Sequence, residues 1–453
     1  MSQRIQPSSP SRRLKKRLAL HRLTRHLCAL LLLAAFFLHI RPAHAYSVLT
    51  HEQIIDLLWR DQLRPLLKTR FPNATDADLR EAHAYAYGGS LIQDIGYYPF
   101  GSHFFSNLVH YVRSGDFVLN MLSEAHTLDE YAFALGALSH YAADTAGHPA
   151  VNQSVALDFP KLRQKYGSTV TYEDSPKSHI RTEFGFDVAQ VAKDRFTSDA
   201  YHDFIGFEVS RPLLERAFQR TYGLPLTDVL PNPDLAINTF RRSVSTFIPM
   251  LTKVAIQMKK DEILHDNPSM TKRRFLYHLS RAQFNREWGR QYRHPSFGIR
   301  LLAFFLRILP HVGPLSTLDV KVPNQTTEQL YMQSVLDSRD HYHADLQSES
   351  SHTLTLPNRD FDTGKETKAG EYALTDETYA ELLSRLAKRS SQTSFAQLPA
   401  TLKSNIVAFY QNAPPPAFAA KQKKKWAETQ SQLLQIESSQ PTPLLTVQPA
   451  GQP

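Results

Sequence analysis

The chain has 453 residues, a formal net charge of +9 and a single Cys. This length is enough for one large domain or two medium ones with a substantial core. Nine of the 52 Lys and Arg residues, and no Asp or Glu, lie within residues 1–45, so the rest of the chain has 43 residues of each sign. Without that segment the chain is neutral, and its charge gives no argument for nucleic-acid binding.

Residues 1–45 have the pattern of a signal peptide. A long basic stretch precedes a thirteen-residue, largely apolar region, Cys28 to Ile40, which is too short to cross a bilayer comfortably. Ala43 and Ala45 then form a small-x-small cleavage signal. We therefore expect a secreted or periplasmic protein cleaved near Ala45, with an uncleaved membrane anchor as the alternative. The only Cys leaves with this segment, so the mature chain must be held by its core, by oligomerisation or by metal.

Cleavage after Ala45 makes Tyr46 the first residue of the mature chain, just before a predicted helix. Thr50 is suited to cap that helix. The free amine and the carbonyl oxygen of Tyr46 could chelate a metal ion, and His51 lies close enough in the sequence to supply a third ligand. Taken alone, His51 would be interpreted as a surface histidine near a helix start.

A second helix is predicted over residues 75–87, followed by a segment with Gly and Pro at residues 88–99. Asp94 lies in the middle of this predicted loop, where the alternative role is a turn residue bonded to the backbone. His103 and His110 follow, and each could instead be a partly buried neighbour of the aromatic residues around it.

Residues 134–147 are rich in Ala and Leu and predict the central helix, which Pro149 is expected to terminate. His140, Asp144 and His148 are spaced four residues apart, so they lie on one face of this helix. Imidazole and carboxylate groups are ligands that zinc takes in proteins. The alternative is a helix that exposes two histidines and an aspartate on a polar surface.

Residues 149–175 contain Pro, Gly and Ser and predict an irregular connection. The next predicted helix carries His179 and Glu183 four residues apart. This pair could hold a metal ion, but a surface salt bridge has the same spacing.

Beyond residue 200 the pattern predicts further helices and no run of alternating strands. Residues 347–374 are rich in Ser, Thr, Asp and Gly and predict a long loop, and residues 437–453 predict a disordered tail. The expected helices cover residues 236–260, 272–289, 298–309, 326–346, 376–389, 399–411 and 417–436.

Taken in order, these motifs resemble the zinc-dependent phospholipase C family, which shares a fold with single-strand nucleases of the S1/P1 type. They are also similar to the catalytic domain of glycosylphosphatidylinositol-specific phospholipase D. The resemblance covers about residues 46–190 and implies an all-α, multi-helix fold with about three zinc ions. We expect a catalytic domain over residues 46–270, with additional C-terminal helices over residues 271–436 packed on it.

The resemblance also assigns the zinc ligands. Two features depart from the bacterial enzymes: Tyr46 stands where they have Trp, and His148 follows Asp144 by four residues instead of five. The choice between His103 and His110 stays open, with His103 favoured by its sequence context. The resemblance implies one zinc on Asp94, His103, His140 and Asp144, a second on His148, His179 and Glu183, and a third on Tyr46, His51 and a bridging Asp144.

The chemistry implied is hydrolysis of a phosphodiester, with Asp94 orienting or deprotonating the attacking water. Tyr97, Tyr98 and Phe104 are candidate substrate-binding residues. We expect a phospholipase C- or D-type enzyme that acts on phospholipid headgroups and contacts a membrane peripherally. The alternatives are a single-strand nuclease or nucleotidase, and a non-catalytic zinc-binding surface protein.

Overall fold

The structure, a computed structural model, describes residues 48–193, 206–259, 320–390, 395–411 and 415–439. These residues form helices joined by turns and loops, with no β-strand and a single isolated bridge between Arg359 and Glu366. The all-α prediction is therefore confirmed. The predicted signal peptide, Tyr46 and the expected helices at 272–289 and 298–309 lie outside the described residues, as does the domain boundary near residue 270.

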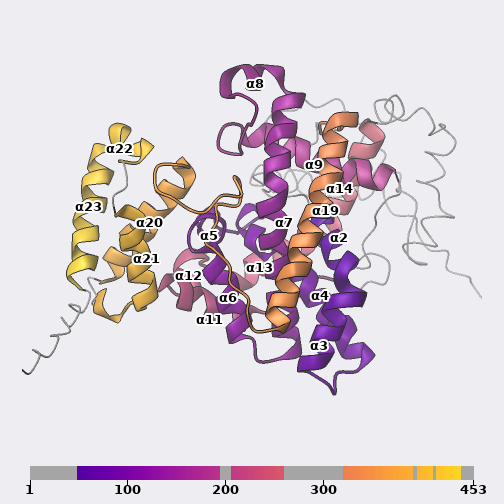
Figure 1. The fold of residues 1–453 in the computed structure, drawn as a ribbon, viewed down its shortest axis with the longest axis horizontal. Helices are drawn as coiled ribbons and strands as arrows, with labels where there is room; N and C mark the ends of the chain where they lie inside the picture. The colour runs from indigo at the N-terminus through magenta and orange to yellow at the C-terminus, as the bar shows by residue number, and fades with distance from the viewer. Residues whose placement is uncertain (1–47, 194–205, 260–319, 391–394, 412–414, 440–453) are drawn as a thin grey trace, which may run out of the picture.

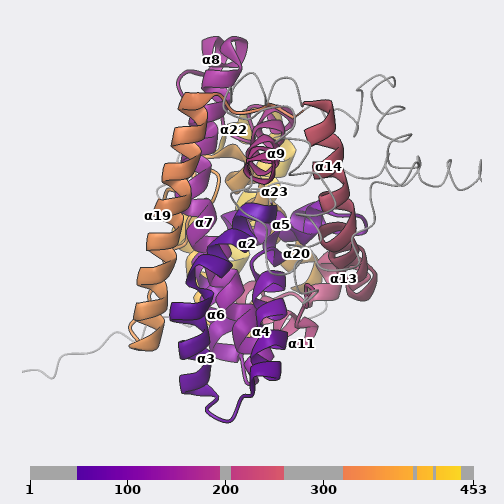
Figure 2. The ribbon, with the colours of Figure 1, turned by 90° about the vertical axis from the view of Figure 1, so that its right-hand side faces the viewer.

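The first half of the described chain forms the helices that surround the long helix α7 (Figures 1 and 2). In chain order they are α2 (Val48–Leu58), η1 (Trp59–Leu63), α3 (Arg64–Arg70), α4 (Asp76–Gly89), η2 (Ile92–Tyr97), α5 (His103–Tyr111), α6 (Ser114–Glu124), α7 (Leu128–Asp158), α8 (Pro160–Tyr166) and α9 (Pro176–Ala192). The segment predicted as a loop around Asp94 is therefore the end of α4 followed by the 3₁₀ helix η2.

The remaining helices cover this group from several sides. They are α11 (Arg211–Tyr222), α12 (Leu226–Val229), α13 (Pro233–Arg242), η3 (Ser243–Phe247), α14 (Ile248–Met258), α19 (Gln325–Ser350), α20 (Ala373–Ser390), η5 (Phe395–Gln397), α21 (Ala400–Tyr410), α22 (Ala417–Lys421) and α23 (Lys423–Ser438). No helix among the described residues is both long and apolar enough to cross a membrane.

Two glycines let α4 and α7 cross at very close range. A Cβ atom on Gly136 would lie 2.1 Å from the carbonyl oxygen of Ala86, and one on Gly89 would lie 2.0 Å from that of Phe133. Both distances are impossible for a real side chain, so glycine is required at this crossing. The close packing holds the end of α4, and the η2 segment that follows it, against the middle of α7.

Helix α19 lies alongside α7 in both views (Figures 1 and 2). The Tyr342 hydroxyl donates to the carbonyl oxygen of Leu135 at 2.9 Å, and Asn324 caps the first turn of α19 through its side chain. Tyr331, also on α19, contacts the Thr50 hydroxyl on α2 at 2.8 Å. Helix α19 is thus packed directly on α7 and α2 of the N-terminal half.

The prediction that Pro149 ends the central helix is wrong. Helix α7 continues through Pro149 to Asp158, and α8 follows almost at once, so the expected irregular connection shrinks to residues 167–175. Proline in a helix removes the hydrogen bond to the carbonyl four residues earlier, here that of Thr145. Packing of α19 and α9 on α7 outweighs that loss. A Cβ on Gly364 would lie 2.5 Å from this Thr145 oxygen, and Gly364 has φ +70°.

The predicted loop after α19 is present and turns back toward the centre of the molecule (Figure 1). The backbone N–H of Arg359 donates to the Ser114 hydroxyl at 2.9 Å, and that of Phe361 donates to the carbonyl oxygen of His110 at 3.2 Å. Residues 356–372, which we call the return segment, are therefore bound to the C-terminal turn of α5 and the N-terminal end of α6.

Candidate metal centre

Five helical elements bring eight titratable side chains together in the interior. None of the eight is more than 3% exposed. They are His51 on α2, Asp94 on η2, His110 on α5, His140, Asp144 and His148 on α7, and His179 and Glu183 on α9.

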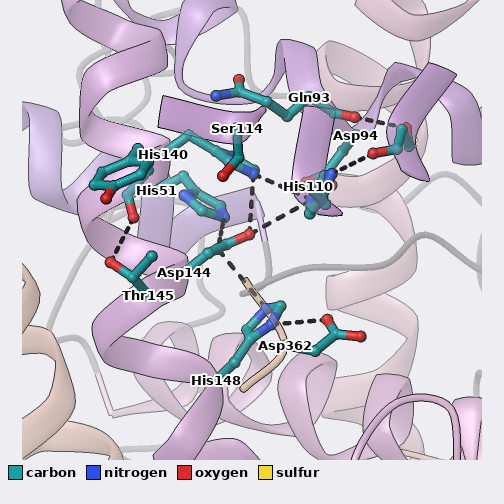
Figure 3. A network of polar contacts seen from close by, with 12 residues as sticks. His51, Gln93, Asp94, His110, Ser114, His140, Asp144, Thr145, His148 and Asp362 are labelled. Atoms are coloured by element: carbon teal, nitrogen blue, oxygen red, sulfur yellow. Dashed lines mark hydrogen bonds and ion pairs between the residues drawn. The ribbon is translucent and has the colours of Figure 1, made fainter. Parts of the chain in front are cut away.

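Asp144 lies at the centre of this cluster (Figure 3). Its Oδ2 atom lies 3.0 Å from Nε2 of His140 and 3.5 Å from Nε2 of His110. Its Oδ1 atom lies 3.4 Å from Nε2 of His51 and 3.7 Å from Nε2 of His148. Each carboxylate oxygen therefore faces a different pair of imidazoles, which is the geometry of a bridging ligand.

Backbone carbonyls fix the orientation of two of these imidazoles. Nδ1 of His140 lies 2.9 Å from the carbonyl oxygen of Ser90, and Nδ1 of His110 lies 2.8 Å from that of Ser106. A carbonyl oxygen only accepts, so each Nδ1 carries a hydrogen, and in the neutral ring that a metal ion requires each Nε2 presents its lone pair to the cluster. A metal-binding histidine commonly has this arrangement.

The second half of the cluster contains His148, His179 and Glu183. Oε1 of Glu183 lies 3.0 Å from Nε2 of His179 and 3.6 Å from Nε2 of His148. The spacing of four residues on α9 puts the first pair on one helical face, as the sequence predicted.

The cluster contains three groups, and within each group the candidate ligand atoms lie within 4.8 Å of one another. The groups are His51, Asp94 and His140; His110, His140 and Asp144; and His148, His179 and Glu183.

Burial and mutual contact shift the pKa values in this cluster. Burial raises the pKa of Asp94 to about 6. Burial opposes the charged form of His110 and of His148, but the neighbouring carboxylates outweigh it and raise their pKa values to about 10 and about 9. Burial likewise opposes ionisation of Asp144, yet His140 and His148 hold its pKa well below the usual value. The metal-free cluster therefore retains protons that a metal ion would displace.

The cluster has the donors that a cation requires. Among the described residues, both oxygens of Asp144, Oδ1 of Asp94, Oε2 of Glu183 and Nδ1 of His179 are buried and lack a hydrogen-bond partner. Leaving such atoms unsatisfied costs about 1–3 kcal/mol each, and more for charged groups. Several buried carboxylates facing imidazole lone pairs are stabilised by a divalent cation, and mixed N and O donors suit zinc.

For the fourth ligand of the first group, the structure places His110 in the cluster and not the favoured His103. Nε2 of His110 lies 3.3 Å from Oδ1 of Asp94, whereas the His103 ring packs edge-on against Tyr97 at 5.3 Å and is partly exposed. His103 is the first residue of α5, while His110 lies two turns deeper in the fold.

The three candidate substrate-binding residues lie in different surroundings. The Tyr97 ring contacts His110 at 6.2 Å, so it borders the cluster. Tyr98 packs on Phe240 in the hydrophobic core, and Phe104 lies under the guanidinium group of Arg385.

Tyr46 lies outside the described residues, but the chain two residues later is firmly placed. The backbone N–H of Leu49 donates to Oδ2 of Asp187 at 3.0 Å, and the Thr50 hydroxyl donates to Oδ1 at 3.1 Å. Asp187 lies one turn after Glu183 on α9. The start of α2 is therefore tied to the helix that carries two of the cluster residues.

Sequence reasoning missed Asp362. Its Oδ1 atom lies 3.1 Å from Nδ1 of His148, although the two residues are 214 positions apart. No helical spacing links them, and the local sequence Asp360-Phe361-Asp362 was part of a segment predicted only as a loop.

Comparison with known proteins agrees with this geometry. Residues 50–230 match the family model described as zinc dependent phospholipase C. That range includes all eight cluster residues and excludes Asp362. No curated protein matches the chain, and no solved structure matches it either. The match supports a zinc-dependent phospholipase C family for residues 50–230, about two fifths of the chain.

Proposed function

We propose that the protein hydrolyses the phosphodiester of phospholipid headgroups, as a phospholipase C- or D-type enzyme with about three zinc ions. The observation that carries this proposal is the buried cluster around Asp144, in which two groups of His and Asp share His140 and a third group is formed by His148, His179 and Glu183. The family match adds that this part of the chain is a zinc-dependent phospholipase-type hydrolase.

The proposed ligand sets combine the family resemblance with the contacts of the cluster, with His110 replacing His103. The proposed sets are Asp94, His110, His140 and Asp144 for the first zinc; His148, His179 and Glu183 for the second; and Tyr46, His51 and the bridging Asp144 for the third. Bound zinc lowers the pKa of a coordinated water to near 7 and neutralises charge that develops on phosphoryl oxygens.

The side chains around this centre orient the attacking water and accept its proton. Asp94 is held by its contact with His110 and by the short η2 helix, and we assign it the role of orienting the attacking water and accepting its proton. Tyr97, whose ring borders His110, supplies an aromatic wall beside the reacting group. The carboxylate of Asp144 stays ionised because His140 and His148 favour its charged form.

Export of the protein and peripheral contact with a membrane are part of the proposal. The signal-peptide pattern supports export. Phe100 supports membrane contact, because it is 59% exposed in the turn just after η2, which carries Asp94. Replacing Phe100 with Ser should weaken sedimentation with phosphatidylcholine vesicles. The matched control is Leu434→Ser, which alters a similarly exposed apolar side chain on the distant helix α23.

The decisive experiment is a turnover panel. Phosphatidylcholine and single-stranded DNA are offered separately to the zinc-loaded protein, with and without a chelator. Chelator-sensitive release of headgroup from the lipid, lost in Asp94→Asn, is the expected result. Faster turnover of DNA would favour the nuclease alternative, and turnover of neither substrate despite bound zinc would favour a non-catalytic zinc protein.

A further inference from the structure

The hydrogen-bond partner of His148 sets the direction of its metal-binding nitrogen. The carboxylate oxygen Oδ1 of Asp362 lies 3.1 Å from Nδ1 of His148. An ionised carboxylate only accepts, so Nδ1 carries a hydrogen, and in the neutral ring that a metal ion requires Nε2 is the nitrogen with the lone pair. That Nε2 atom faces Glu183 at 3.6 Å and Asp144 at 3.7 Å. Figure 3 shows His148 between Asp144 and Asp362.

Asp362 is itself held from several sides. Its Oδ2 atom accepts hydrogen bonds from the hydroxyls of Tyr111 at 2.9 Å and Tyr372 at 2.5 Å. Its backbone carbonyl accepts from the side-chain amide of Asn152 at 2.7 Å. The residue is 3% exposed, so water does not compete for these bonds. A carboxylate fixed at both oxygens holds the imidazole it faces in one orientation.

The neighbouring residues of the return segment are seated on the same centre. The Phe361 ring lies 5.2 Å from the ring of His110 and 5.9 Å from that of His140, and Phe361 is fully buried. On the other side of Asp362, Gly364 approaches the carbonyl oxygen of Thr145 on α7. Asp362 is thus placed by contacts on both sides of it in the chain.

His148 differs in this respect from the other oriented histidines. His140 and His110 use backbone carbonyls from segments inside the family match. His148 uses a charged group from residue 362, which lies well beyond the match. A carboxylate partner increases the basicity of a zinc-binding histidine as well as orienting it.

We propose that Asp362 is the positioning residue of His148, and that the return segment thereby completes the zinc centre from outside the family-matching region. This inference rests on the proposed zinc centre. It predicts a role in holding the metal ion at the group formed by His148, His179 and Glu183, with no direct contact between Asp362 and the substrate.

The test is the zinc affinity of Asp362→Asn in the full chain, measured by competition with a chromogenic chelator. Asn has the same shape but lacks the charge, so the weakest-held zinc should bind about 10–100-fold less tightly, as for other outer partners of zinc histidines. Asp360→Asn is the matched control. Asp360 is a buried carboxylate in the same segment, but it accepts from Thr363 and Thr375 instead of a histidine, and its variant should keep the parent affinity.

A double-mutant cycle distinguishes positioning of the His148 imidazole by Asp362 from a general structural role of Asp362 in the return segment. In a His148→Ala background, Asp362→Asn should cause no further loss of zinc affinity, because the imidazole through which it acts is gone. The absorption spectrum of the cobalt-substituted protein gives a second readout, which should change in Asp362→Asn and not in Asp360→Asn.

Three results would overturn the inference: unchanged zinc affinity in Asp362→Asn, equal losses in Asp362→Asn and Asp360→Asn, or an undiminished effect in the His148→Ala background. These outcomes leave the proposed function intact when the parent chain binds zinc. A parent chain that binds no zinc would refute the proposed function, and this inference with it.

Discussion

Oδ1 of Asp144 lies 3.4 Å from Nε2 of His51, while the other oxygen of the same carboxylate faces His140 at 3.0 Å. The two oxygens of one carboxylate therefore contact histidines on two sides of the cluster. Replacing Asp144 with Asn removes a charge shared between metal positions, so the variant should lose more than one zinc ion. Metal analysis by mass spectrometry of the purified variant measures this loss. A fully loaded Asp144→Asn protein would exclude the bridging role, and Asp360→Asn provides the control for replacing another buried carboxyl group.

His110→Ala and His103→Ala test the fourth ligand of the first group. Only His110 reaches Asp94 and Asp144 at ion-pair distance among these two histidines. We expect His110→Ala to lose about one zinc ion and most turnover, since a structural or catalytic zinc needs three or four protein ligands. His103→Ala should keep its zinc, and the opposite pattern in metal analysis would reverse the assignment.

The free amine of Tyr46 gives a prediction about processing. If this amine binds zinc, an amide at the same position cannot replace it, so a chain with one extra residue before Tyr46 should bind about one zinc fewer. Its turnover of phosphatidylcholine should fall with the metal content. Tyr46→Trp keeps the backbone donors and should behave like the parent. Full zinc in the extended chain would remove Tyr46 from the ligand set and leave His51 to act without it.

Zinc binding should release protons and weaken as the pH falls. The carboxylates around His110 and His148 raise their pKa values to about 10 and about 9, so both imidazoles are protonated at pH 7 in the metal-free protein. Zinc needs them neutral, and binding at pH 7 should therefore release about two protons. Raised pKa values favour the protonated form, so the competition grows stronger below pH 9. Calorimetry in buffers of different ionisation enthalpy measures the release; no buffer dependence would contradict it.

Local periodicity is the part of the site that the sequence could predict. His140, Asp144 and His148 share a face of α7, and His179 and Glu183 share a face of α9, because a helix repeats every 3.6 residues. Periodicity also explains why the sequence left the choice of the fourth ligand open. His103 and His110 are seven residues apart, so they share a face of α5, and spacing alone cannot tell which turn of that helix meets the cluster.

The errors that remain come from tertiary packing. The local sequence around Pro149 predicts the end of a helix. Packing of neighbouring helices on α7 stabilises the helix beyond this proline, as far as Asp158. In the sequence, Asp362 is one of several acidic residues in a polar predicted loop. Its contact with His148 depends on where the return segment packs against the helices. Neither the continuation of α7 through Pro149 nor the contact between Asp362 and His148 can be predicted from the residues nearby in the sequence.

The 214 residues that separate His148 from Asp362 also constrain the order in which the protein can mature. During synthesis, all eight cluster residues emerge before residue 362 does. A contact between such distant residues closes a very large loop and forms late in folding. The nascent chain would therefore pass through a stage in which its ligands are present but His148 lacks its carboxylate partner. Metal acquired at that stage would be held less tightly than metal acquired by the finished chain.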